Sequence, residues 1–317
     1  MKKKFSFATL LERYALVLVF VLMVVVFTSI VPTFFSWNSL LNTLSAAAPM
    51  GIATIGMAII ILQGGTDLSA GASMYFGCIS AYLILGEAPS VPGYLLLSVV
   101  AGALIGLLNG LMISRFKVLP FIVTYGTMMM VRGISLTLSK QKNIIFNNDC
   151  AKFISAYHIA GVPLVIIMFL ALMVAAWFVL NYTPFGRQLY AVGNNPRSAE
   201  KLGINIKRIR LAAYTICGAL CGLGGILTGA QAGIISTGLG DGKEFAFIST
   251  AVLSGVSLSG GKCKIFPNLL VGILIYTAIE TGLVMSNANP YLYQIVRGGL
   301  IAFAVIVDCI RYKGDLR

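Results

Sequence analysis

Apolar segments recur along almost the whole chain, with only short polar loops between them. About ten can be marked, at residues 14–31, 48–63, 70–86, 92–113, 119–138, 163–181, 211–235, 247–259, 266–285 and 291–309. A straight helix that crosses a membrane needs about 20 apolar residues. The shortest segments, 48–63 and 247–259, are therefore expected to be broken or half-spanning helices, which a membrane tolerates only inside protein or beside a watery path.

The composition agrees with this pattern. Hydrophobic residues make up 58% of the 317 residues and charged residues only 10%, whereas soluble domains carry about 25% charged residues. We expect an all-α polytopic membrane protein with about ten transmembrane or half-spanning helices. The two largest loops, 139–162 and 182–210, are too short to fold alone, so residues 1–317 are expected to form a single membrane domain.

The basic residues predict the orientation. With the N-terminus inside, 17 of the 23 Lys and Arg residues lie inside, and Lys140, Lys142, Lys152 and Lys243 lie outside. Loops on the cytoplasmic side of membrane proteins carry such an excess of positive charge. Both termini are therefore expected in the cytoplasm, and the net charge of +13 does not indicate nucleic-acid binding.

The stretch "GVSLSGGKCK" (255–264) is similar to the signature sequence of ABC-type ATPases and to a phosphate-binding loop. A phosphate loop requires G-x-x-x-x-G-K-[ST], but Gly261 stands where the lysine should be, and Cys263 follows Lys262. We expect a tight cytoplasmic turn in which glycines supply positive φ angles and lysines anchor the topology. This chain is not expected to hydrolyse ATP.

Metal and cofactor sites are also not expected. None of the six cysteines forms C-x-x-C, and four lie in apolar segments, which favours buried thiols. A single histidine, His158, cannot form a multi-histidine metal site.

The loop 182–210 contains helix-boundary signals. Asn195 is a good N-cap, Pro196 suits the first helical turn and Gly203 suits the position after a helix end. These residues predict a short cytoplasmic helix over about 196–202.

Ala199 and Leu202 stand three residues apart on this short helix and are expected to share an apolar face. A compact capped helix in basic surroundings is typical of a docking element for a soluble partner. An inert connecting loop is the alternative.

Several polar residues interrupt the apolar segments. In "QGGTDLSAGAS" (63–73), Asp67 is expected to cap a helix that begins near Leu68, either as a simple capped turn or as a gate residue beside a transport path. Asn109 and Glu280 could hydrogen-bond a polyol. The candidates for a translocation path or gate are Gln63, Asp67, Asn109, Arg132, Glu280 and Arg297.

Three of these candidates, Arg132, Glu280 and Arg297, fall within the outer thirds of their helices. Charges in a membrane are costly and usually face a partner or water. These side chains are expected either to pair with one another, to line an outward vestibule, or to extend toward the outer surface.

Two glycine-rich strings are alike, "AGALIGLLNGL" (101–111) and "CGALCGLGGIL" (217–227). Their helices should run in opposite directions, as an inverted repeat would require. Small residues at this spacing also allow helices to approach closely, and those expected to do so are Gly102, Gly106, Gly110, Gly218 and Gly222.

The motifs taken in order resemble those of the membrane permease subunit of ABC importers for monosaccharides of the ribose/galactose type. The similarity extends over about 14–313 and includes "GGTDLSAG" (64–71), "LPFIVTYGTMMMVRGI" (119–134), "FGRQLYAVGNNPRSAEKLGI" (185–204), "LSGVSLSGGK" (253–262) and "NPYLYQIVRGGLIAFAVIVD" (289–308). One departure is "EFAFIS" (244–249), which keeps Glu244 but has Ala246 where the family often has a second acid.

This resemblance implies a multi-pass subunit of the bacterial cytoplasmic (inner) membrane. It implies as partners a cytoplasmic ATPase that binds ATP and Mg²⁺, an extracytoplasmic sugar-binding protein, a second permease copy or paralogue, and membrane lipid. Coupling to the ATPase would fall to Gly193, Asn194, Asn195, Pro196, Ala199, Leu202 and Gly203.

Three alternatives remain at this point. The same kind of permease could carry a nucleoside, a furanosyl signal or a branched-chain amino acid. An ion-coupled secondary transporter would require acids near the middle of helices, and an integral membrane transferase would require clustered acids or a histidine near a membrane face.

Overall fold

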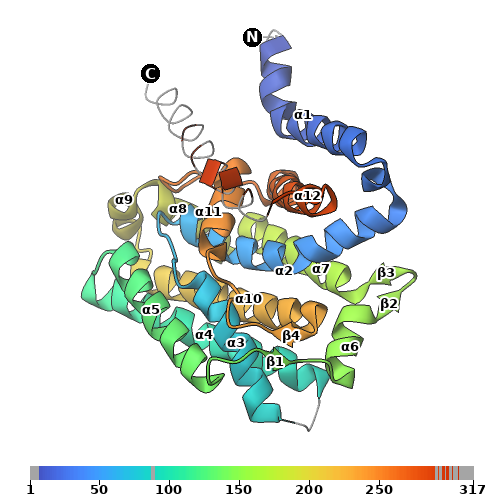
Figure 1. Ribbon diagram of the computed structural model, residues 1–317. Helices are drawn as coiled ribbons and strands as arrows, with labels where there is room; N and C mark the ends of the chain where they lie inside the picture. The colour runs from blue at the N-terminus through green and yellow to red at the C-terminus, as the bar shows by residue number, and fades with distance from the viewer. Residues whose placement is uncertain are drawn as a thin grey trace.

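The computed structural model describes residues 7–86 and 90–289, and residues 292, 295, 296, 298, 299, 302 and 306. The helices, drawn in Figure 1, are α1 (Phe7–Ile30), η1 (Pro32–Phe35), α2 (Trp37–Leu62), α3 (Ala70–Leu85), α4 (Val91–Phe116), α5 (Pro120–Leu138), α6 (Asp149–Ala156), α7 (Leu164–Tyr182), α8 (Pro184–Asn194), α9 (Pro196–Lys201), α10 (Ile206–Ala232), α11 (Lys243–Leu253), η2 (Ile265–Leu269) and α12 (Leu270–Met285). The strands are β1 (Ile144–Ile145), β2 (His158–Ile159), β3 (Val162–Pro163) and β4 (Ile234–Ile235).

The polytopic helical class is confirmed. Within the described residues, six helical stretches are long and apolar enough to cross a membrane, namely α2, α4, α5, α7, α10 and Ile265–Met285. There are also two shorter apolar helices: one is Leu16–Ile30, which is part of α1, and the other is α3. Most of the predicted segment 291–309, with Arg297, lies outside the described residues, as do both chain ends.

The bundle has two distinct ends, which we call the α9 end and the α6 end. At the α6 end, β1 pairs antiparallel with β4, and β2 pairs with β3. The start of α4 lies there too, because the side-chain amide of Asn148, which caps α6, donates to the Tyr94 hydroxyl over 2.9 Å. Helix α7 runs from this end to the α9 end, where α8 and α9 follow it (Figure 1).

Helices α4 and α10 form the most extensive helix pair and run antiparallel. A Cβ atom on Gly102 would overlap the carbonyl oxygen of Gly218, and one on Gly222 would overlap that of Ser98. The close approach expected from the two glycine-rich strings is therefore confirmed, because each string packs on the other. The inverted repeat itself stays a prediction.

Helix α2 is continuous, so the expectation of a broken segment at 48–63 was wrong. Pro49 lacks an N–H group, which leaves the carbonyl oxygen of Ser45 without its helical donor. The side-chain amide of Gln231, at the end of α10, donates to that oxygen over 2.9 Å. A neighbouring helix thus supplies the missing hydrogen bond, and α2 continues to Leu62.

Helices α3 and α11 are two short helices that follow irregular segments. Their 16 and 11 residues span only about 24 and 16 Å, less than the roughly 30 Å of a bilayer core. Helix α11 is short, as the expectation for 247–259 requires, and a half-span there stays a prediction. Each helix follows an irregular stretch that returns into the bundle. We call residues 63–69 the first re-entrant segment and residues 236–242 the strap.

The starts of α3 and α11 meet inside the bundle. A Cβ on Gly71, in the first turn of α3, would overlap the carbonyl oxygen of Gly240 in the strap and contact the carboxylate of Glu244 in α11. Helix N-termini carry partial positive charge. The buried carboxylate of Glu244 lies beside both of these N-termini and compensates that charge.

The glycine contact between α4 and α10 gives a stability prediction. We expect Gly102→Ala to lower the free energy of unfolding by about 2 kcal/mol or more, because the added methyl group meets backbone rather than a movable side chain. Thermal unfolding in detergent measures this loss. Gly126→Ala in α5, whose Cβ meets nothing within 4 Å, is the matched control, and an equal loss in both variants would contradict the prediction.

Candidate translocation path and coupling surface

Asp67 and Asn109, both path candidates, are brought together by a residue that sequence reasoning missed. The Asp67 carboxylate accepts hydrogen bonds from the N–H and hydroxyl groups of Ser69, at 2.8 and 2.6 Å. The Ser69 hydroxyl accepts in turn from the side-chain amide of Asn109, at 2.8 Å. Helix α3 begins only at Ala70, so Asp67 shapes the turn before the helix and does not cap a helix at Leu68 as expected.

We call Asp67, Ser69 and Asn109 the Asp67 cluster. This cluster lies within the span of the bundle. Asn109 is seven residues before the end of α4 at Phe116, which places it about 10 Å inside that end. The side chains of Asp67 and Asn109 are at most 1% exposed. The Asn109 amide oxygen and both polar atoms of the buried Gln63 side chain have no partner among the described residues. Buried groups of this kind ordinarily bond to water or to a ligand.

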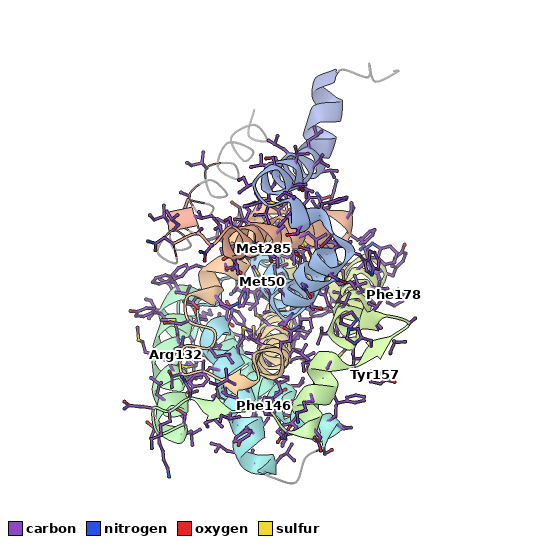
Figure 2. The ribbon with its side chains drawn as sticks, turned by 45° about the vertical axis from the view of Figure 1, so that its right-hand side comes forward. Met50, Arg132, Phe146, Tyr157, Phe178 and Met285 are labelled. Atoms are coloured by element: carbon purple, nitrogen blue, oxygen red, sulfur yellow. The ribbon has the colours of Figure 1, made fainter. Side chains whose placement is uncertain are left out.

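Glu280 lies in a different place, on the wall of a cavity of about 490 Å³ between α2, α10, α11 and α12. We call it the polar cavity. Its polar lining residues are Asn42, Thr228, Gln231, Lys243, Thr277, Glu280 and Thr281. Met50, marked in Figure 2, belongs to its apolar wall.

The chemistry of the polar cavity suits a hydroxyl-rich solute. Its carboxylate, ammonium and amide groups can donate and accept hydrogen bonds, while the Thr228 hydroxyl and the Gln231 amide already donate to backbone carbonyls. Opposite charges from Lys243 and Glu280 face the same space, and the Tyr276 hydroxyl donates to Glu280 over 3.3 Å. Lys243, expected in an outer loop, instead begins α11.

A larger cavity of about 880 Å³ lies between α1, η1, α2 and α12 and differs in character. Its walls are almost wholly apolar, and the hydroxyl groups of Thr28, Ser29 and Thr43 are bonded to carbonyls of their own helices. Such a surface suits an acyl chain and not a sugar.

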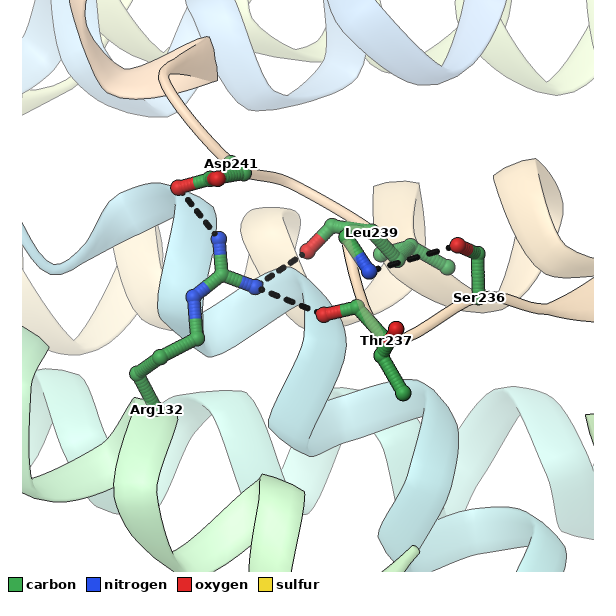
Figure 3. Close-up of polar contacts among 6 residues, drawn as sticks. Arg132, Ser236, Thr237, Leu239 and Asp241 are labelled. Carbon is green, nitrogen blue, oxygen red and sulfur yellow. Dashed lines mark hydrogen bonds and ion pairs between the residues drawn. The ribbon is translucent and has the colours of Figure 1, made fainter. Parts of the chain in front are cut away.

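Arg132 holds the strap. Its guanidinium pairs with the Asp241 carboxylate at 2.9 Å and donates to the carbonyl oxygens of Leu239 and Thr237 at 2.9 and 3.5 Å (Figure 3). The guanidinium also lies 5.8 Å from the centre of the Tyr75 ring. Of the alternatives given for Arg132, pairing with Glu280 does not occur, because Arg132 binds Asp241 and the carbonyl oxygens of the strap.

The predicted short helix between α7 and α10 is present as α9. The Asn195 side chain accepts from the N–H of Ser198 over 3.1 Å, and Pro196 is the first helical residue. Gly203 has φ +79° and follows the helix end. Helix α8, which sequence reasoning missed, precedes α9 and ends with the buried Gly193 and the exposed Asn194.

The expected shared face of Ala199 and Leu202 was wrong. Ala199 is 2% exposed and packs into the core, whereas Leu202 is 80% exposed. Helix α9 ends at Lys201, so Leu202 follows its last turn and points elsewhere. The result is an apolar side chain presented on an otherwise polar surface.

The glycine-rich stretch 255–264 forms the expected turn. Gly255, Gly260 and Gly261 have φ angles of +90°, +84° and +75°. The N–H of Gly260 donates within the turn to Ser257, and that of Gly261 donates to the last carbonyl of α2, on Leu62, over 2.8 Å. These amides are used inside the protein and are not arranged around a phosphate.

Titratable clusters do not indicate a metal. Among the residues that the structure describes, no group of three or more His, Cys, Asp or Glu side chains could hold a metal ion. The five described cysteines are buried and free.

Comparison with known proteins assigns the family. The family model described as "Branched-chain amino acid transport system / permease component" matches residues 39–305. The chain belongs to this family.

The permease is similar over nearly its full length to curated import permeases. It is 33% identical to the galactose/methyl galactoside import permease protein MglC of Salmonella typhimurium, with 98% of this chain and 97% of that protein covered. It is 32% identical to the ribose import permease protein RbsC of Escherichia coli, with 97% and 96% covered. It is 31% identical to the D-allose transport system permease protein AlsC of Escherichia coli, with 97% and 94% covered. No solved structure matches the permease.

Membership in this family agrees with the interpretation of the sequence. The permease is a membrane-embedded transport component and not an enzyme, and ATP hydrolysis is carried out by a separate subunit. The apparent ATPase signature at 255–264 is accordingly part of a permease turn.

The strap contacts lead to a test in the permease. We expect Arg132→Gln to lower the free energy of unfolding by about 2 kcal/mol, because it removes bonds to carbonyls for which the described residues supply no other donor. Asp241→Asn should cost about 1 kcal/mol or less, since the Asp241 side chain is 80% exposed. Thermal unfolding and proteolysis of the strap measure both, and an equal effect of the two changes would show that the ion pair alone holds it.

Proposed function

We propose that this permease is the membrane subunit of an ATP-driven importer that carries a monosaccharide such as galactose or ribose. The observation that carries the proposal is the similarity, over nearly the full length of both chains, to permeases named for galactose, ribose and allose. The polar cavity supports it, since its volume and hydrogen-bonding groups suit a hydroxyl-rich solute.

We further propose that the α9 end faces the cytoplasm and that both chain ends lie there, with about ten crossing or half-crossing helices. The charge distribution favours this orientation, because the loop 182–210 carries six of the basic residues. The polar cavity would then lie toward the outside, and the Asp67 cluster toward the inside.

The partners follow from this orientation. A cytoplasmic ABC ATPase, which would bind ATP and Mg²⁺, would dock on α8 and α9, with exposed Leu202 as its apolar contact. An extracytoplasmic sugar-binding protein would deliver cargo at the α6 end. A second permease copy or a paralogue, together with lipid, would cover the exposed apolar helix faces.

Other cargoes are less well supported. The three relatives compared above are named for sugars, which favours a sugar over a branched-chain amino acid. A secondary transporter would lose uptake when the ion gradient is dissipated, and an ATP-driven importer would retain it while ATP lasts.

The docking proposal predicts the effect of one surface change. Purified in mild detergent with its neighbouring genes co-expressed, the permease should bring an ATPase subunit with it. Leu202→Asp should reduce this co-purification about tenfold or more, because a charge replaces a buried apolar contact at the interface. Ile145→Asp at the α6 end, where the side chain is 74% exposed, should leave it unchanged. A permease that purifies alone, in cells whose uptake ceases with the proton gradient, would contradict the proposal.

The cargo proposal predicts the effect of a change in the polar cavity. We expect Glu280→Gln to lower sugar uptake about tenfold, because a charged acceptor binds hydroxyl groups more strongly than an amide does. Uptake of radiolabelled galactose and ribose by cells measures the loss. Asp149→Asn removes one exposed acid of α6 at the same end of the bundle and should have little effect. Equal losses in the two variants would indicate a general effect of charge and no sugar contact.

A further inference from the structure

Three segments that are far apart in the sequence meet at the α9 end. The N–H of Gly261 donates to the carbonyl oxygen of Leu62, the last residue of α2, over 2.8 Å. A Cβ on Gly193, near the end of α8, would overlap the same oxygen and lie 2.6 Å from the Gly261 nitrogen. A Cβ on Gly260 would lie 2.8 Å from the Gly193 oxygen. We call these four residues the glycine joint.

A side chain reinforces the joint. The hydroxyl of Tyr190, on α8, donates to the carbonyl oxygen of Cys263 over 2.7 Å. Burial raises the pKa of Tyr190 to about 12, so its hydroxyl keeps the proton throughout the physiological range. This bond therefore ties α8 to the turn 255–264.

The joint leads directly to the Asp67 cluster. The first re-entrant segment begins at Gln63, one residue after Leu62. It is fixed midway by the Tyr214 hydroxyl, which donates to the carbonyl oxygen of Thr66 over 3.1 Å. Asp67 and Ser69 follow, and Ser69 is bonded to Asn109.

Beyond the cluster, the contacts continue to the polar cavity. Gly71, at the start of α3, packs against Gly240 of the strap. Lys243, which stands three positions after Gly240, is the first residue of α11 and lines the polar cavity. An uninterrupted series of bonded and packed groups thus connects α8 with the proposed sugar path.

We propose that the glycine turn 255–264 is the relay between the ATPase-binding helices and the path. The last carbonyl of α2 accepts a hydrogen bond from the turn and is packed against the end of α8. Displacement of α8 and α9 would therefore carry the first re-entrant segment and Asp67 with it. Backbone packed against backbone shifts as a unit and is not deformed continuously. This relay rests on the proposed function, because it requires an ATPase that moves α8 and α9.

The competing explanation is that the turn only satisfies a helix end. The last four carbonyl groups of any helix lack partners within the helix, and Gly261 supplies one donor. A purely structural role predicts that weakening the joint changes stability alone. A relay predicts that transport is separated from ATP hydrolysis.

The test uses the complex of the permease with its co-purified ATPase, reconstituted in liposomes with the binding protein. Tyr190→Phe removes one hydroxyl group and leaves the ring. We expect the subunits to stay together and ATP hydrolysis to continue, while sugar transported per ATP falls about threefold to tenfold, the effect of one hydrogen bond on a two-state equilibrium. Tyr182→Phe, on the 58% exposed Tyr182 at the end of α7, is the matched control.

Gly193→Ala should uncouple transport more strongly, since its methyl group would separate all three segments. Amide hydrogen exchange over residues 62–69 gives a second readout. In the wild type its protection should change when nucleotide binds the ATPase, and in Tyr190→Phe that response should be lost. If Gly193→Ala does not fold, Tyr190→Phe still decides the question.

The outcomes separate the two proposals. A wild-type permease without an ATPase would overturn the proposed function. If the wild type is coupled to an ATPase, and Tyr190→Phe shows normal transport per ATP and a normal exchange response, only the relay is overturned. A Tyr190→Phe complex of lower thermal stability and unchanged coupling would assign the turn a structural role, which also overturns the relay.

Discussion

The constraint on which this structure depends is that backbone polar groups away from water must find partners inside the protein. Several backbone carbonyls in the described residues lack a helical donor, and at three places a donor from a distant segment compensates. Gln231 donates to the carbonyl freed by Pro49 in α2, Gly261 donates to the end of α2, and Arg132 donates to the strap. These bonds connect α2, α5, α10 and the two interrupted regions, so the fold is held together where its helices are irregular.

Regular and irregular parts of the bundle have different roles. The pair α4 and α10 is packed backbone to backbone through glycines and leaves no room for adjustment. The first re-entrant segment and the strap lie beside this pair and are held by a few hydrogen bonds and one ion pair. The first re-entrant segment is mostly buried and the strap partly so, but hydrogen bonds from remote side chains, and not helical geometry, fix the backbone of both.

The sequence predicted features that depend on local signals. The capping residues Asn195 and Gly203 gave α9 to within one residue at its end, and the glycines of 255–264 gave the turn. Prediction from the sequence failed where a residue's bonding or packing partner is far away in the chain. The short apolar segment 48–63 suggested a broken helix, whereas α2 begins at Trp37 and continues past Pro49 because the remote Gln231 side chain bonds to the freed carbonyl. Lys243, Thr277 and Gln231 join Glu280 in the polar cavity only through tertiary packing, and no local pattern identifies them.

The likeness of "LSGGK" to an ATPase signature has a physical explanation. Glycines with positive φ angles allow successive N–H groups to point toward one acceptor, and in nucleotide-binding loops that acceptor is a phosphate. In this permease the N–H of Gly261 points at the carbonyl of Leu62, an acceptor left unsatisfied at the end of a helix. The preceding N–H, of Gly260, donates instead to Ser257 within the turn, so the two amides do not converge on one acceptor. The lysines that follow, Lys262 and Lys264, are exposed, as the sequence-based expectation of a surface turn requires.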